Sequence, residues 1–291
     1  MKPAPFEYEA PADLSEVLEL LAEGGDDAKL LAGGQSLVPA MNFRLARPSL
    51  LIDLNGVADL AYLHEEGGEL RIGAMTRQRQ VERSPLVARR LPLVHETMPW
   101  IAHPQIRNRG TFGGSLAHAD PAAELPSVVL ALGGRFHLKS RSGERWVAAE
   151  DFFQGLFETA RKSDEILLEV AIPAQAPGSG WAFEEMARRA GDFAMVGVGV
   201  VMTLAAGGTI AAARIGLVSV ADKPILAPQA AALLLGEKPS EALFRAAAAT
   251  CAEQEIDPTD DLHGSADYRR HLTAVLVRRA LERAFARTQA V

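Results

Sequence analysis

Apolar and polar residues recur with two different periods along this chain, and the changes of period divide it into segments. Helical spacing runs through LSEVLELLAEGG (14–25), where Asp13 can cap the first turn and the two glycines can end the helix. Short apolar runs in AKLLAGGQSLVPAMNF (28–43) and SLLIDLNGV (49–57) predict strands, the first broken by a glycine turn. Residues 1–57 therefore predict a small α/β unit.

Residues 58–175 mix the two periods. Strand patterns occur in GELRIGAMT (68–76), RFHLKS (135–140) and ILLEVAIP (166–173), and a helical pattern with a break at Pro92 spans 84–102. Asp120 followed by Pro121 predicts a helix start, and the glycine pair 133–134 predicts its end.

The segment AQAPGSG (174–180) is the best candidate for a linker between domains. A strand-rich meander follows, with a hairpin turn predicted at Gly207 and Gly208. Helical patterns occupy 239–255 and 266–288. We therefore expect an α+β protein with a domain over residues 1–175, in subdomains of about 1–57 and 58–175, and a C-terminal domain over 176–291 with an antiparallel sheet and helices.

Composition narrows the classes of function. The formal net charge is −7, which argues against a nucleic-acid partner. The sequence has no run of 18 apolar residues, so we expect no membrane-spanning segment. The first residues lack the pattern of a secretory signal, so we expect a cytoplasmic protein. The single cysteine, Cys251, cannot hold an iron–sulfur cluster alone or form an internal disulfide, and its alanine-rich surroundings predict a buried thiol.

Two glycine-rich segments differ from ordinary turns. The first glycine segment is LAGGQSL (31–37) and the second is GTFGGSL (110–116), and each sets adjacent glycines beside hydroxyl residues. Glycine lets the backbone approach a ligand, and successive N–H groups form an anion-binding concavity. Together the two segments predict a binding site for one pyrophosphate. The alternative is that each is only a turn, since neither matches a dinucleotide fingerprint or a P-loop.

The chain as a whole resembles a known family. The stretches LAGGQSLVPAMNFRLARPSLLIDL, HPQIRNRGTFGGSLAHADPAAELP, DEILLEVAIP, ARRAGDFAMVGVGV and LHGSADYRRHLTAVLVRRAL are similar, in this order, to the FAD-binding medium subunit of carbon monoxide dehydrogenase and its relatives in the xanthine dehydrogenase, or molybdenum hydroxylase, group. The resemblance implies a two-part FAD-binding domain of the PCMH, or vanillyl-alcohol-oxidase-like, type, followed by a CO dehydrogenase flavoprotein-type C-terminal domain.

The resemblance also implies a set of FAD contacts. The first glycine segment contributes Leu31, Ala32, Gly33, Gly34, Gln35, Ser36 and Leu37, and the second contributes Thr111, Gly113, Gly114 and Ser115. Beyond the glycine segments, the matched positions are Ile101 on the adenine side, Glu124 near the ribose, and Leu167 and Phe193 at the ring system. Each has a structural alternative, because Ile101 and Leu167 suit a core and Glu124 suits the first turn of a helix.

Two positions depart from some relatives, which carry a lysine where this chain has Glu185 and a tyrosine where it has Phe193. A glutamate facing the flavin would oppose the stabilisation that a lysine gives to a reduced, anionic ring, so the departure concerns the flavin potential.

The function implied by the resemblance is electron transfer. A molybdopterin-binding large subunit would oxidise substrate, a small subunit with [2Fe–2S] clusters would relay electrons, and FAD on this chain would deliver them to NAD, a quinone or another acceptor. A dimer of such heterotrimers is the expected assembly. The competing interpretations are a flavoprotein oxidoreductase that works alone and a non-redox binding or assembly protein.

Overall fold

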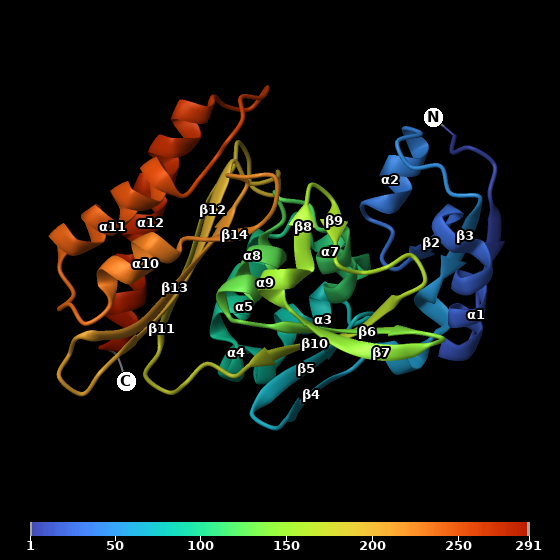
Figure 1. Cartoon of the computed structure of the whole chain (residues 1–291), viewed down its shortest axis with the longest axis horizontal. Coiled ribbons are helices and arrows are strands. Elements are labelled where there is room, and N and C mark those ends of the chain that lie inside the picture. Colours follow the sequence, from blue (N-terminus) through green and yellow to red (C-terminus); the bar gives the residue numbers. More distant parts are fainter. Residues whose placement is uncertain (1, 290–291) are drawn as a thin grey trace.

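A computed structural model describes residues 2–289 and shows three lobes in a row along the chain's long axis (Figure 1). The first lobe is a parallel three-stranded sheet of order β1-β3-β2, with β1 Glu7–Glu9, β2 Ala28–Leu31 and β3 Leu50–Asp53. Helix α1 (Leu14–Gly24) begins as predicted, because the Asp13 carboxylate accepts a hydrogen bond from the Glu16 N–H at 3.0 Å. A short helix after the first glycine segment, α2 (Leu37–Asn42), was not predicted.

The second lobe is an antiparallel five-stranded sheet with helices gathered on one side (Figure 1). Its order is β4-β5-β10-β6-β7, with bounds Leu63–Glu66, Glu69–Gly73, Ile166–Pro173, Arg135–Ser140 and Gly143–Ala148. The helices are α3 (Gln78–Arg83), α4 (Pro85–Arg90), α5 (Pro92–Thr97), α6 (Pro104–Arg109), α7 (Phe112–His118), α8 (Glu124–Ala131) and α9 (Ala149–Phe152). A two-stranded ribbon joins β8 (Phe153–Gly155) to β9 (Glu158–Thr159).

Two helix starts in this lobe test the sequence-based expectations. Pro92 separates α4 from α5, so the predicted break is confirmed. The predicted start at Asp120 is wrong, because α8 begins at Glu124. The Asp120 carboxylate instead accepts the Ala122 N–H in a turn, and the Pro121 carbonyl accepts the Ser219 N–H at 2.8 Å, which holds the turn to the third lobe.

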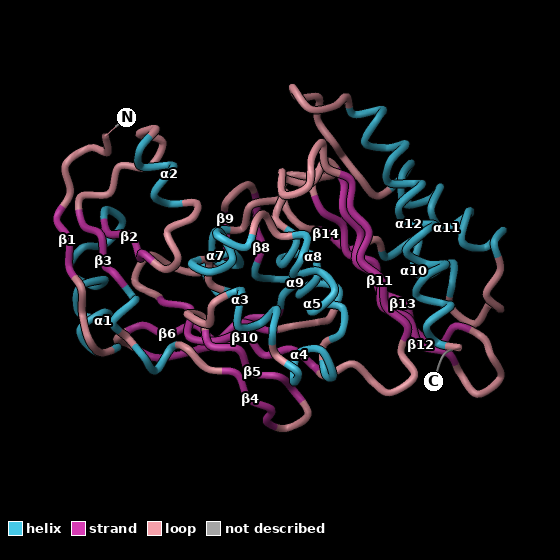
Figure 2. The backbone as a smooth tube through the Cα atoms, turned by 180° about the vertical axis from the view of Figure 1, so that it is seen from behind, coloured by secondary structure: helices cyan, strands magenta, loops and turns pink. Residues whose placement is uncertain are grey.

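The third lobe is an antiparallel four-stranded sheet of order β11-β12-β13-β14, with helices on its outer face (Figures 1 and 2). The strands are Gly180–Met186, Val196–Leu204, Ile210–Val218 and Ile225–Leu226, and the helices are α10 (Pro228–Leu234), α11 (Glu241–Gln254) and α12 (Ala266–Thr288). The hairpin predicted at Gly207 and Gly208 joins β12 to β13. Cys251 is buried among the apolar residues of this lobe, as expected.

The inner face of this sheet is built for a close approach of α8. A Cβ at Gly216 would lie 2.4 Å from the Ser127 carbonyl oxygen, and the Ser127 hydroxyl donates to the Leu217 carbonyl at 2.6 Å. Glycine at position 216 therefore lets a helix of the second lobe rest on the backbone of the third.

Ion pairs tie the end of the chain to the second lobe. The Glu96 carboxylate on α5 accepts hydrogen bonds from Arg283 at 2.8 Å and from Arg287, both on α12, and from the Phe183 N–H at 3.1 Å. Because Glu96 is largely buried, these bonds fix how the two lobes face each other. Within residues 2–289, no helix is long and apolar enough to cross a membrane.

Candidate functional site

The fold brings the two glycine segments together, although about 80 positions separate them in the sequence. A Cβ added at Gly33 would lie 2.5 Å from the Arg109 carbonyl oxygen and 2.7 Å from the Gly110 Cα. A Cβ added at Gly114 would lie 3.3 Å from the Ala32 Cβ. At Gly33 only a residue without a side chain permits this contact, so this glycine sets the distance between the segments.

The first glycine segment is an open bend after β2. Gly34 has φ +73°, which only glycine adopts without strain. In the described chain, the backbone N–H groups of residues 33–36 donate to no protein acceptor, while the Gln35 side chain donates to the Gly33 carbonyl at 2.9 Å. Four successive free donors around a positive-φ glycine form the kind of concavity that binds an anion.

The second glycine segment differs from the expectation of a free bend, because it forms the start of helix α7. The N–H groups of Phe112 and Gly113 donate to the carbonyls of Thr76 at 2.9 Å and Ala74 at 3.0 Å. The Gly114 N–H donates to the Thr111 hydroxyl at 3.0 Å, which caps the helix. These N–H donors already bond within the protein, so this segment would give a ligand room to approach and few hydrogen bonds.

A groove of about 440 Å³ lies along the first segment. Its walls come from three elements, the first glycine segment with α2, the end of β3, and α6. The lining residues are Leu31, Ala32, Gly33, Gly34, Gln35, Val38, Pro39, Asp53, Asn55, Ile106 and Arg109. Free N–H donors, an exposed arginine and missing side chains together fit a diphosphate, and therefore fit FAD.

Several of these residues were missed at the sequence level. Asp53 ends β3 and Asn55 follows it, at the same edge as the end of β2. Ligands of parallel sheets bind beyond the carboxyl ends of the strands, so this edge was a usable signal. Arg109 flanks the second glycine segment in the sequence and could be expected to steer phosphates, but its place in the groove depends on how α6 approaches the first lobe.

The remaining predicted residues lie outside this groove. Ile101 and Leu167 are both buried in the main core cluster, with exposed fractions of 7% and 4%. The Ile101 carbonyl accepts a hydrogen bond at 2.7 Å from Arg107, whose guanidinium also pairs with Glu82. Phe193 is 69% exposed on the loop between β11 and β12.

Two buried carboxyl groups lie near the place where the second and third lobes join. Glu124, at the start of α8, is 6% exposed, and Glu185, on β11, is 8% exposed with one carboxylate oxygen that has no hydrogen-bond partner among the described residues. Burial raises the pKa of Glu124 to about 7. Burial, and then the nearby charge of Glu124, raise the pKa of Glu185 to about 8. Glu185 therefore tends to hold a proton at neutral pH.

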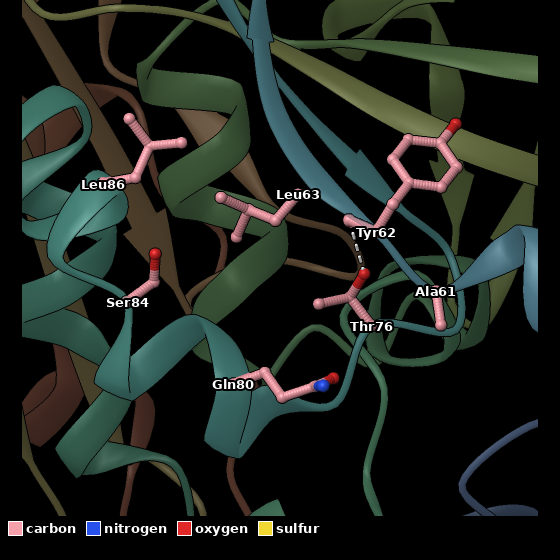
Figure 3. Close-up of a pocket in the computed structure, with 7 residues that line it drawn as sticks. All are labelled: Ala61, Tyr62, Leu63, Thr76, Gln80, Ser84 and Leu86. Atoms are coloured by element: carbon pink, nitrogen blue, oxygen red, sulfur yellow. Dashed lines mark hydrogen bonds between the residues drawn. The ribbon is translucent and has the colours of Figure 1, made fainter.

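A second depression, of about 290 Å³, lies between β4 and helices α3 and α4 (Figure 3). Some of its polar groups are already engaged: the Thr76 hydroxyl donates to the Tyr62 carbonyl at 2.7 Å, and the Ser84 hydroxyl accepts the Val87 N–H. The Tyr62 hydroxyl points away from the depression and donates to Glu169. The depression has no charged side chain in its lining, so it is a weaker candidate for a diphosphate than the groove. Residues 2–289 also contain no cluster of side chains suited to a metal ion.

The fold and the groove define the class of protein. Residues 4–175 match the family described as "FAD binding domain in molybdopterin dehydrogenase", and residues 181–284 match "CO dehydrogenase flavoprotein C-terminal domain". The chain belongs to the FAD-binding medium subunits of the carbon monoxide dehydrogenase family, and it is an oxidoreductase subunit. The resemblance seen in the sequence is thereby confirmed, as are FAD as the cofactor and the fold class.

Individual relatives cover nearly the whole chain. It is 43% identical over 289 residues to the 6-hydroxypseudooxynicotine dehydrogenase complex subunit alpha of Paenarthrobacter nicotinovorans, covering 99% of this chain and 97% of that protein. It is 42% identical to the carbon monoxide dehydrogenase medium chain of Hydrogenophaga pseudoflava, covering 99% of each. A chain in a solved structure of carbon monoxide dehydrogenase from Hydrogenophaga pseudoflava superimposes with a TM-score of 0.96 at 43% identity, and 99% of each chain is covered.

Proposed function

We propose that this chain is the electron-transfer subunit of a molybdenum hydroxylase-type dehydrogenase, in which FAD accepts electrons from [2Fe–2S] clusters of a partner subunit and passes them to an external acceptor. The observation that carries the proposal is the row of free N–H donors at residues 33–36, in contact with the second glycine segment. This row suits the diphosphate of FAD.

The chain's own groups would act in three ways. The residues of the first glycine segment would bind the diphosphate through backbone N–H groups, and Ser36, which is exposed, would add a hydroxyl donor. Thr111, Gly113, Gly114 and Ser115 would let the cofactor approach α7. Ile101 would supply an apolar contact on the adenine side and Leu167 one at the ring, Glu124 would lie near the ribose, and Phe193, with Glu185, would set the surroundings of the ring.

The proposed partners follow from the same class. We expect a large subunit with molybdopterin and a small subunit with [2Fe–2S] clusters, arranged as a dimer of heterotrimers in the cytoplasm. Several relatives are named as subunits or medium chains of dehydrogenases, among them the caffeine dehydrogenase subunit beta of Pseudomonas, at 40% identity. We further propose that the division between the domains falls at residues 175–176.

The test begins with the purified chain. Apoprotein titrated with FAD should quench flavin fluorescence to a saturating one-to-one end point and develop the flavin's visible absorption. Co-expression with the genes beside its own should then yield a complex that contains all three subunits. A colourless protein that ignores FAD would support a non-redox role, and an active oxidoreductase that purifies alone would support the stand-alone alternative.

A further inference from the structure

Side-chain hydrogen bonds, and not only backbone contact, join the two glycine segments. The Asn55 amide donates to the Ala32 carbonyl at 3.1 Å, in the first segment. The Arg77 guanidinium donates from one terminal nitrogen to the Asn55 side-chain oxygen and from the other to the Arg109 carbonyl, beside the second segment. A continuous chain of three hydrogen bonds therefore runs from one segment to the other through two side chains.

Arg77 is well placed to make this connection. Its backbone lies directly beside Thr111: the Gln78 N–H donates to the Gly110 carbonyl at 2.9 Å, and the Phe112 N–H donates to the Thr76 carbonyl at 2.9 Å. The backbone of this stretch therefore holds the second segment, while the side chain reaches Asn55, which is bonded to the first. The planar guanidinium presents its two terminal nitrogens in a fixed fork to two separate acceptors, which the single nitrogen of a lysine does not reproduce.

The orientation of Asn55 is itself fixed. The Asp53 carboxylate accepts the Asn55 N–H at 2.9 Å and also contacts the Asn55 amide, while the Tyr8 hydroxyl donates to the same carboxylate at 2.6 Å. Asn55 thus has both ends of its amide engaged, one toward Ala32 and one toward Arg77. A side chain with both ends bonded has one orientation, which is what a fixed spacing requires.

The charges at this place favour an anion. Burial, and then the nearby guanidinium of Arg109, lower the pKa of Arg77, while the Asp53 carboxylate acts in the opposite direction. Two guanidinium groups and one carboxylate leave net positive charge beside the groove. A bound diphosphate would relieve the repulsion between the two arginines.

We propose that Arg77 and Asn55 form a positioning clip, which holds the first glycine segment at a fixed distance from the second so that the free N–H groups converge on the cofactor diphosphate. The inference rests on the proposed function, since it concerns how the same site binds FAD. The clip residues act through the segments they hold. Arg77 does not line the groove, whereas Asn55 does, so the Arg77 variants separate the clip from direct contact with the cofactor.

The experiment compares apoprotein variants by their dissociation constants for FAD and by competition with ADP, which carries the diphosphate without the flavin. Arg77→Met and Asn55→Ala should each weaken FAD and ADP by about tenfold, as expected for loss of a charge-assisted hydrogen bond. Arg77→Lys should fail to restore affinity, because a single nitrogen on a flexible stem does not reproduce the fixed fork of two nitrogens that reaches Asn55 and Arg109. The double variant should lose little more FAD affinity than the single variant that binds FAD more weakly, because both changes break the same chain of hydrogen bonds.

The matched control is Arg83→Met, which removes an exposed arginine from the end of the neighbouring helix α3 and should leave FAD affinity unchanged. Hydrogen exchange supplies a readout separate from affinity. FAD should protect residues 33–36 in the wild type and protect them less in Arg77→Met, while exchange at residues 112–114 and the melting temperature of the apoprotein stay near wild type.

The outcomes separate the clip from the proposed function. If wild-type apoprotein binds neither FAD nor ADP, the proposed function fails. If the wild type binds both and the Arg77→Met and Asn55→Ala variants bind them equally well, the clip is overturned while the function stands. Full rescue by Arg77→Lys also overturns the clip, because the charge alone would then account for the effect.

Discussion

The two glycine pairs of this chain are similar in sequence but have different roles in the structure. Gly33 and Gly34 lie in an open bend whose N–H groups are free, and Gly34 needs its positive φ. Gly113 and Gly114 lie in a helix whose first N–H groups are bound, and neither has a positive φ. One pair supplies donors, and the other supplies clearance for its neighbours.

The difference shows that a repeated glycine motif has no single meaning. A Cβ at Gly113 would lie 2.5 Å from the Ala74 Cβ, inside the second lobe, whereas a Cβ at Gly33 would meet the Arg109 carbonyl across the boundary between lobes. Substitutions at the two pairs should therefore separate ligand affinity from protein stability.

The largest effect on FAD affinity is expected at Gly33. Gly33→Ala should drive the first segment away from the Arg109 carbonyl and weaken FAD by about 10- to 100-fold, from an overpacking cost of about 1–3 kcal/mol. Gly113→Ala should chiefly lower the melting temperature of the apoprotein, by about 2–6 °C, and should weaken FAD less than Gly33→Ala does, because its new Cβ would meet Ala74 inside the second lobe. Titration and thermal melts on both variants check this, and equal FAD affinity in Gly33→Ala and wild type would contradict it.

A difference in pH response should follow from the buried acids that lie away from the first segment. The folded state raises the pKa of Glu185 to about 8, so between pH 4.5 and 8 the folded chain binds more protons than the unfolded chain. Stability from this group is therefore lost as the pH rises through that window. Glu185→Gln should remove this loss. Its free energy of unfolding, relative to that of the wild type, should therefore be higher at pH 9 than at pH 5, by on the order of 2 kcal/mol.

Urea unfolding of Glu185→Gln at pH 5, 7 and 9 measures this effect. Glu184→Gln is the control, because Glu184 pairs with Arg283 instead of lying unpartnered. A parallel pH profile for wild type and Glu185→Gln would refute the raised pKa.

A smaller effect is expected at Gly34. Gly34→Ala places a Cβ at φ +73°, which costs about 1 kcal/mol, and should weaken FAD by about fivefold if the bend shifts to relieve the strain. Gly34→Asn should be milder, because asparagine tolerates left-handed backbone better than alanine. The dissociation constants for FAD decide between them, and an alanine variant that binds better than the asparagine variant would count against the strain argument.

The smallest effect is expected at the cap of α7. Thr111→Ala should cost about 1 kcal/mol of stability, since its hydroxyl accepts the Gly114 N–H. Gly114→Ala should cost a similar amount, because the new Cβ would lie 2.5 Å from that hydroxyl. In the Thr111→Ala background the Gly114→Ala change should cost almost nothing, and chemical denaturation of the four proteins completes the cycle. Simple additivity would show that the hydroxyl is not what excludes the methyl group.

Sequence patterns predicted elements that depend on neighbouring residues. The Asp13 cap, the break at Pro92 and the turn at Gly207 and Gly208 each follow from local chemistry, and the structure contains all three. The start of α8 was missed because a contact from Ser219, about 100 residues away, holds the Asp120 turn in place.

In the candidate site too, local features could be predicted and features that depend on distant residues could not. The glycine segments were visible because their composition is unusual, and their meeting was expected. The difference in how the two segments use their N–H groups was not expected, because it depends on the carbonyls of Thr76 and Ala74, which no local pattern connects to Gly113. Arg77 and Asn55 escaped notice for the same reason, as single polar residues whose partners are distant in sequence.

The bond between Glu96 and Arg287 has a consequence for the order in which the protein matures. These residues are 191 positions apart, and Arg287 belongs to the last turn of α12. During translation the second lobe is complete long before the helix that braces it exists. The contacts between the second and third lobes therefore reach their final form only once synthesis has finished, which makes the packing of α12 against α5 a step for the released chain and not for the nascent one.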